Sequence, residues 1–134
     1  MLASAEPPAL SEMDRSAGYH LSQAARKALL VDPALLGEWL SPGEARRMSP
    51  PSRLAVAAAR MALRGAGWSE GLPDERTGVA VSTAFGPSSY SEGLLRQILL
   101  EGPESASPIL FMESVANAPA AQIAIASRAS SSRP

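Results

Sequence analysis

The residue types that carry most enzyme chemistry are scarce in this sequence. Its 134 residues include one histidine, His20, and no cysteine. The missing cysteine excludes disulfides, thiolate metal sites and a cysteine nucleophile within these residues. His20 has no second metal ligand or triad partner, and the four serines between residues 82 and 91 have no neighbouring base to activate them. We therefore expect His20 on the surface, and we predict no catalytic residue and no metal site.

One turn of the sequence could resemble an anion-binding site. Residues 81–86, Val-Ser-Thr-Ala-Phe-Gly, join a predicted strand to a predicted helix, and glycine-rich turns at helix N-termini bind phosphate groups. Only one glycine is present, so we expect a plain tight turn instead. The motifs of nucleotide-binding loops, zinc proteases, serine hydrolases and EF-hands do not occur in the sequence.

Charge and hydropathy exclude two further classes of partner. The formal net charge is −1, which gives no attraction for nucleic acid. The five arginines between residues 46 and 64 are typical of a solvated helix face. No apolar run reaches the roughly 18 residues of a membrane helix, and the first residues lack the pattern of a signal peptide. We expect a cytoplasmic protein that binds neither nucleic acid nor a membrane.

Helical patterns dominate the first half of the chain. Prolines interrupt the first fifty residues, where only Ser22–Val31 has helical spacing of apolar residues. The pattern is clearer from Ser49, which can cap a helix whose first turn contains Pro50 and Pro51. The helix is predicted over Ser52–Leu63, because apolar residues form one stripe there and arginines lie towards the other side.

The second half of the chain alternates between strand and helix patterns. A short strand is predicted over Thr77–Thr83, whose residues are small or β-branched and uncharged. A strand without polar alternation is usually buried on both faces, as in the centre of an α/β sheet. A helix over Ser88–Leu100 follows, and a further helical piece begins at Ser107 and leads into the alanine-rich residues 120–126. This succession indicates an α/β fold.

Three blocks of the sequence carry longer patterns in a fixed order. They are RRMSPPSRLAVAAARMALRGAGW (Arg46–Trp68), RTGVAVSTAFG (Arg76–Gly86) and SPILFMESVANAPAAQIAIA (Ser107–Ala126). Together they resemble the N-terminal part of β-ketoacyl synthases, in which the third block is written S-P-x-x-F-x-x-T/S-V-x-N-A-x-A-G-Q-I-A-I-A. The third block is the most specific, because seven residues match it without a gap: Ser107, Pro108, Phe111, Val115, Asn117, Gln122 and Ile123.

The resemblance implies a fold and a division of the chain. The fold would be an incomplete thiolase-like α/β fold, its N-terminal part, with alanine-rich helices packed on a short central sheet. Residues 46–126 would form the β-ketoacyl synthase-like region, after a poorly defined helical and loop extension over residues 1–45. The polar residues 127–134 are predicted to be a disordered tail. The sequence departs from the family at Ser82 and Ala121, where glycine is common, and it lacks the valine-rich opening strand.

The resemblance also implies a reaction that this chain cannot complete alone. In the family, acyl groups pass from a carrier protein or CoA to a cysteine, and decarboxylation of a malonyl unit supplies the attacking carbanion. That cysteine and two histidines would follow Ala126, where this sequence ends in SRASSSRP. We expect a non-catalytic N-terminal fragment of an acyltransferase of fatty acid, polyketide or aryl polyene synthesis. It would need no cofactor, and its partners would be acyl carrier protein and a ketosynthase subunit, in a homo- or heterodimer.

Three residues match positions that bind substrate in the family. Phe85 stands in the turn after the predicted strand, where relatives place an apolar residue of the acyl pocket. Leu110 and Val115 match positions that reach into the partner subunit's pocket in relatives. The alternative is that all three side chains belong simply to the core.

Two other functions stay open at the level of the sequence. A synthase-like protein without the cysteine could be a non-catalytic partner that shapes the acyl pocket of an active ketosynthase. The chain could also be an unrelated small interaction domain that matches the three blocks by chance. A truncated synthase would expose helix stripes that face missing layers, and exposed apolar surface of this kind predicts association.

Overall fold

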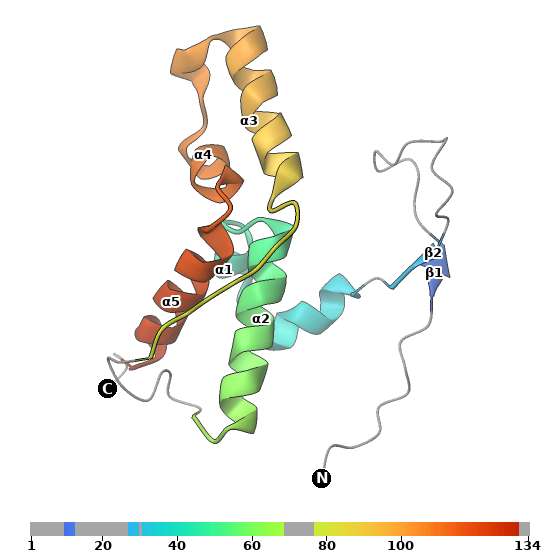
Figure 1. Ribbon diagram of the computed structural model, residues 1–134, viewed down its shortest axis with the longest axis vertical. Helices are drawn as coiled ribbons and strands as arrows, with labels where there is room; N and C mark the ends of the chain where they lie inside the picture. The colour runs from blue at the N-terminus through green and yellow to red at the C-terminus, as the bar shows by residue number, and fades with distance from the viewer. Residues whose placement is uncertain (1–9, 13–26, 30, 69–76, 132–134) are drawn as a thin grey trace. The chain divides into compact units, whose positions relative to one another are not determined.

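The computed structural model describes residues 10–12, 27–29, 31–68 and 77–131, and the chain divides into two units, residues 1–33 and 34–134 (Figure 1). In the first unit, β1 (Ser11–Glu12) pairs antiparallel with β2 (Lys27–Ala28). The helix predicted over 22–31 is therefore wrong at Lys27 and Ala28, whose backbone groups face a second strand. The rest of that prediction up to residue 26, and His20, lie outside the described residues.

The second unit begins with two short helical segments, η2 (Pro33–Glu38) and α1 (Pro42–Ala45). A capping box forms the start of α1. The Ser41 hydroxyl accepts a hydrogen bond from the Glu44 N–H at 3.3 Å, and the Glu44 carboxylate accepts one from the Ser41 N–H at 2.9 Å. Both donors would otherwise lack a partner at the start of a helix.

The helix predicted after Ser49 is confirmed as α2 (Pro50–Gly65). The Ser49 hydroxyl caps it by accepting a hydrogen bond from the Ser52 N–H at 3.4 Å. The two prolines that follow Ser49 occupy first-turn positions, where a helix has no acceptor for an N–H in any case. Ser52 and Val56 are buried on the inner side of the helix, so the capped end of α2 lies in the interior of the unit.

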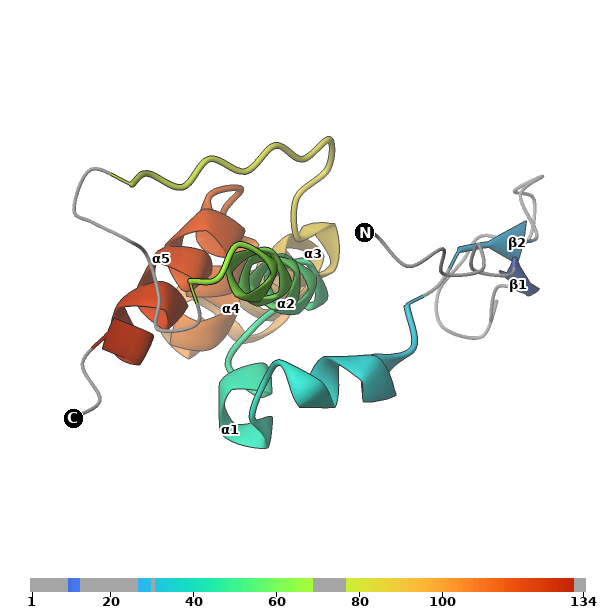
Figure 2. The ribbon, with the colours of Figure 1, turned by 90° about the horizontal axis from the view of Figure 1, so that it is seen from below.

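The predicted central sheet is not confirmed. Residues 77–83 run as a coil along the side of α2 and α5 (Figures 1 and 2), and the described residues of the second unit contain no strand. A strand needs a neighbour that receives its N–H and C=O groups. Around this segment the described neighbours are helices, whose backbone groups already bond within each helix. Val79 packs against the core, but residues 80–85 are exposed, so the burial on both faces that was expected of a central strand is not found either.

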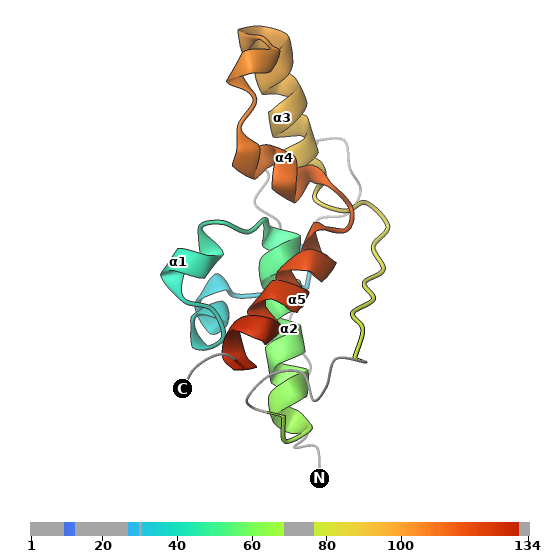
Figure 3. The same cartoon turned by 90° about the vertical axis from the view of Figure 1, so that its left-hand side faces the viewer.

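The next two helices form an antiparallel pair. The predicted helix is confirmed as α3 (Ser88–Glu101), and η3 (Pro103–Ser105) leads back to α4 (Pro108–Ser114). Gly102, with φ of 93°, makes the reversal at the end of α3. The Ser107 N–H donates to the Gln97 side-chain oxygen of α3 at 2.8 Å, which fixes the start of α4 beside α3 (Figure 3).

The last helix, α5 (Ala118–Ser131), turns sharply away from α4. It includes residues 127–131, which the sequence assigns to a disordered tail. Ser127 is buried there, and its hydroxyl donates to the Ile123 carbonyl at 2.8 Å, as in a continuing helix. Within the described residues no single helix is long and apolar enough to cross a membrane, and only α4 taken with residues 118–127, bent by 102°, reaches that length and composition.

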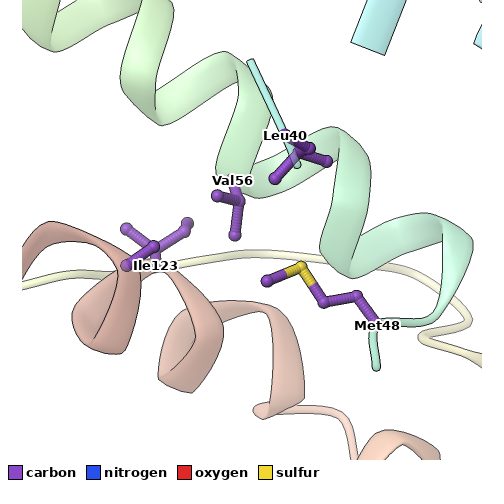
Figure 4. Packing of buried hydrophobic residues seen from close by; sticks show 5 residues of the cluster. Leu40, Met48, Val56 and Ile123 are labelled. Atoms are coloured by element: carbon purple, nitrogen blue, oxygen red, sulfur yellow. The ribbon is translucent and has the colours of Figure 1, made fainter. Parts of the chain in front are cut away.

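The core of the second unit lies between α2 and α5. Leu40 and Met48 lie before and after α1, and their side chains point towards those of Val56 on α2 and Ile123 on α5 (Figure 4). The buried cluster consists of Leu40, Met48, Val56, Ile123 and Ala126, and Leu36, Ala55, Ala59 and Val79 pack against it. The second unit is therefore built on two helix pairs, α2 with α5 around this core and α3 with α4 beside it.

Candidate functional site

The turn that carries Phe85 lies at the junction of α3 with the segment that precedes it. Gly86 has φ of 59°, and its N–H donates to the Thr83 hydroxyl at 3.0 Å. A side chain at Gly86 would contact the Ala116 backbone, 3.7 Å away. The positive φ favours glycine at this position, and the Phe85 side chain beside it is 88% exposed.

Phe85 forms one end of an open apolar groove along α3. The groove is shallow and open to solvent, with a volume of about 700 Å³, and is lined by Phe85, Ser88, Ser91, Glu92, Leu95, Arg96, Leu99 and Leu100. Its three leucines are exposed, Leu99 to 81%. The charged side chains of Glu92 and Arg96 give the groove one acidic and one basic contact.

The other two predicted site residues are Leu110, on α4, and Val115, directly after α4. Neither lines this groove. Leu110 is half-buried and points at α3, since a side chain at Gly93 would meet both Leu110 methyl groups at 3.9 Å. Val115 follows the last turn of α4 and is exposed. The end of α4 is held beside the first turn of α3 by the Ser91 hydroxyl, which donates to the Ser114 carbonyl at 2.9 Å.

The outer side of α4 presents a second apolar surface. Ile109, Phe111 and Met112 are all at least half exposed, and Val115 continues the surface beyond the end of the helix. Four large apolar side chains on so short a segment form a patch of the kind that contacts another molecule. We refer to Ile109, Phe111, Met112 and Val115 as the α4 patch.

The side of α4 that faces inwards carries a buried carboxylate, Glu113, which is 1% exposed. It accepts hydrogen bonds from the Ser49 N–H at 2.8 Å and the Ser52 hydroxyl at 2.7 Å, both at the start of α2. Its other oxygen accepts from the Gln122 amide of α5 at 2.6 Å. Glu113 thus connects α4 to both helices of the core pair.

The hydrogen bonds around Glu113 favour its ionised form in spite of its burial. Burial by itself raises the pKa of this carboxyl, but the hydrogen bonds from Ser52, Ser49 and Gln122 outweigh it, so the pKa lies below its ordinary value. The sequence alone did not identify this residue. The available signal was one acidic residue within the apolar stretch of α4, together with two serines three positions apart, and it required knowing that α4 meets the start of α2.

Two of the arginines expected on a solvated face in fact join α2 to the preceding segments. Arg60 donates to the Trp39 carbonyl and to the Glu44 carboxylate, the latter at 2.7 Å. Arg64 lies over the Trp39 ring, 4.1 Å from its centre, and pairs with Glu38 at 3.2 Å. These contacts attach η2 and α1 to α2 and form no concave site.

Comparisons with known proteins identify a family for this chain. The family model described as "Beta-ketoacyl synthase, N-terminal domain" matches residues 6–130. No curated protein matches the sequence. Within the part of the chain that the structure describes, no group of three or more His, Cys, Asp or Glu side chains lies together as a metal site would require.

Proposed function

Because the chain belongs to the beta-ketoacyl synthase N-terminal domain family, we propose that it supplies part of the acyl-binding wall and of the partner surface of a condensing enzyme with a thiolase-like fold. Its 134 residues contain no cysteine. The nucleophile of the family's reaction would therefore come from residues outside this sequence. In this role Phe85, Leu110 and Val115 act by shape and apolar contact, and none of them takes part in bond making.

The observation that supports this role is the exposed apolar groove beside Phe85. An acyl chain gains free energy when it leaves water, by about 0.8 kcal/mol for each buried methylene group. The three leucines of the groove and the Phe85 ring offer such a surface. Arg96 lies in the same groove and could contact the polar end of an acyl thioester.

A titration with an acyl thioester tests the acyl-binding role. We expect decanoyl-pantetheine to shift the amide NMR signals of Phe85, Leu95 and Leu99, and the methyl signals of the two leucines, because these side chains line the groove. Pantetheine without the acyl group serves as the control ligand and should leave them unchanged. Phe85→Ala should weaken the acyl-dependent shifts, and Leu35→Ala, which truncates another exposed apolar side chain outside the groove, should not.

The titration has two results that would count against the proposal. Shifts that spread over the α2–α5 core without the groove signals would indicate that the acyl chain enters the core and not the groove. Equal shifts with pantetheine alone would show that no acyl surface is recognised.

The second candidate function is that of a non-catalytic partner subunit that pairs with an active ketosynthase. The α4 patch favours it, since Ile109, Phe111 and Met112 are exposed and adjacent. Interfaces of stable complexes concentrate apolar and aromatic side chains of this kind at their centres. In that arrangement acyl carrier protein would deliver substrate to the active subunit, and this chain would contribute Leu110 and Val115 to the shared pocket.

A further inference from the structure

The two helix pairs of the second unit are joined at few points. α2 packs mainly on α5, and α3 packs mainly on α4. Figure 3 shows the α3–α4 pair extending beyond one end of the α2–α5 pair. The groove and the α4 patch both belong to the α3–α4 pair, whereas the buried apolar cluster lies in the other pair. The placement of the groove relative to the core therefore depends on the contacts between the pairs.

Glu113 makes most of the described polar contacts between the two pairs. It projects from α4 and accepts hydrogen bonds from Ser49 and Ser52 at the start of α2 and from Gln122 on α5. A further polar contact between the pairs, from the Tyr90 hydroxyl to the Met48 carbonyl, is 3.5 Å long and correspondingly weak. α4 also contacts α5 directly, and Gly86 lies against Ala116 between these two helices.

We propose that Glu113 is a positioning residue, whose carboxylate fixes the α3–α4 pair, and with it the Phe85 groove and Val115, against the α2–α5 core. The acyl-binding consequence rests on the function proposed above, but the fixing of the two pairs does not. A carboxylate suits this place because it only accepts hydrogen bonds, and the groups that face it all donate.

Within the described residues, none of the groups that donate a hydrogen bond to the Glu113 carboxylate is a cation. Ser49 and Ser52 face it from α2 and Gln122 faces it from α5, and all three are uncharged. Two titratable side chains of the same junction, Arg53 of α2 and Tyr90 of α3, hydrogen-bond the Met48 carbonyl instead. The position of α4 is thus set by directed hydrogen bonds and not by a pair of opposite charges.

Spin-label distances test the proposal directly, because a chain without cysteine accepts labels at chosen sites only. One pair of labels, at Met61→Cys and Met112→Cys, measures the distance between α2 and α4. A second pair, at Met61→Cys and Ile125→Cys, measures the distance between α2 and α5. All three methionine and isoleucine side chains are exposed. In Glu113→Gln, one side-chain oxygen is replaced by an NH₂ group that cannot accept a hydrogen bond. We expect the single narrow α2–α4 distance to become a broad distribution while the α2–α5 distance stays narrow.

Glu101→Gln, at an exposed position on α3, is the matched control and should change neither distance. If Glu113→Gln does not fold, Ser52→Ala in the same labelled chains decides the question, because it removes only one of the hydrogen bonds to the carboxylate. Two results overturn the proposal: an unchanged α2–α4 distance, or loss of both distances together, which would make Glu113 a general support of the core.

The acyl titration separates this proposal from the function on which its consequence rests. If the α2–α4 distance broadens in Glu113→Gln but decanoyl-pantetheine never shifts the groove signals, the positioning role holds and the acyl-binding role fails. If the groove binds the acyl probe equally in both proteins and the distance is unchanged, the acyl-binding role holds and the positioning role fails.

Discussion

At the scale of single residues, charge in this protein serves mainly to join helices. Glu44 illustrates this, because its carboxylate caps its own helix, α1, and also accepts from Arg60 of α2. The hydrogen bond from Arg60 is the largest cause that lowers the pKa of Glu44, to about 2; burial opposes it and the hydrogen bonds from Ser41 add to it. Glu113 reaches a lowered pKa by hydrogen bonds from uncharged donors alone.

The lowered pKa of Glu44 predicts a dependence of stability on pH. A carboxyl whose pKa is lower in the folded state stabilises that state above its unfolded pKa, and the stabilisation is lost as the pH falls through the folded pKa. For Glu44 this window runs from 4.5 down to about 2. In Arg60→Gln we expect the pKa of Glu44 to move back towards 4.5, so that its contribution to stability changes less across the window, with the hydrogen bonds from Ser41 retained.

Carbon NMR titration of the Glu44 carboxyl measures its pKa separately from the pKa of Glu113, which is also lowered. Arg64→Gln is the matched control, because Arg64 belongs to the same helix and pairs with Glu38. An identical Glu44 pKa in the wild type and in Arg60→Gln would show that Arg60 is not the main cause of the shift.

At the scale of helices, the two faces of α5 differ in burial although their residues are similar. Ile123 is buried in the core between α2 and α5, and Ile125, two positions later, is exposed. We expect Ile123→Val to lower the free energy of unfolding by about 0.5–1.5 kcal/mol, since it removes a buried methylene group. The matched change Ile125→Val should leave the free energy of unfolding nearly unchanged.

Urea denaturation followed by circular dichroism measures both values. Equal losses in the two variants would mean that Ile125 is buried in solution, for example against a second molecule. Dilution of the protein would then identify this case, because burial against a second molecule depends on concentration.

The sequence predicted the helices after Ser49 correctly, whereas the central sheet that it predicted is absent from the described residues. The difference has a physical reason. The start of α2 follows from local signals, a capping serine and two prolines, and the hydrogen bonds that form it close within a few residues. The apolar pattern around Val79 predicted a strand buried on both faces, but only Val79 contacts the core and residues 80–85 are exposed. Strand formation at the same residues depends on a neighbouring strand elsewhere in the chain, and no local pattern guarantees that neighbour.

The candidate site was predictable to a similar, limited degree. The resemblance directed attention to Phe85, and the structure places it in an apolar groove. The sequence predicts the helix that carries Leu95, Leu99 and Leu100, but it does not predict their exposure, because that depends on which neighbours α3 has. The role of Glu113 depends on residues more than sixty positions away in the sequence, a relation that local spacing does not express.

At the scale of the whole chain, the α4 patch leads to a prediction about assembly. If the chain is a partner subunit, it should form a heterodimer with a complete ketosynthase subunit that carries the cysteine and both histidines. Phe111→Ser should weaken this pairing by about tenfold or more, because burial of a large apolar side chain is worth about 1.5–3 kcal/mol. Leu35→Ser, which alters an equally exposed residue outside the patch, should leave the affinity unchanged.

Sedimentation velocity of the mixed proteins measures the affinity. Pairing that is equally strong in Phe111→Ser and in the wild type would exclude the α4 patch from the interface. An absence of any heterodimer at high protein concentration would contradict the partner-subunit role itself.

The coil between α2 and α3 has a consequence for how this protein is handled and stored. Residues 79–85, Val-Ala-Val-Ser-Thr-Ala-Phe, carry no charge and no proline, and much of this segment is exposed. Short, uncharged segments rich in β-branched and aromatic residues are those that stack into amyloid-like fibrils. The nearest charged residues in the sequence, Arg76 and Glu92, lie outside the segment and act as its gatekeepers. Ageing of the isolated protein should therefore produce ordered fibrils that grow from this segment, and a Lys substitution at the exposed Val81 should delay them.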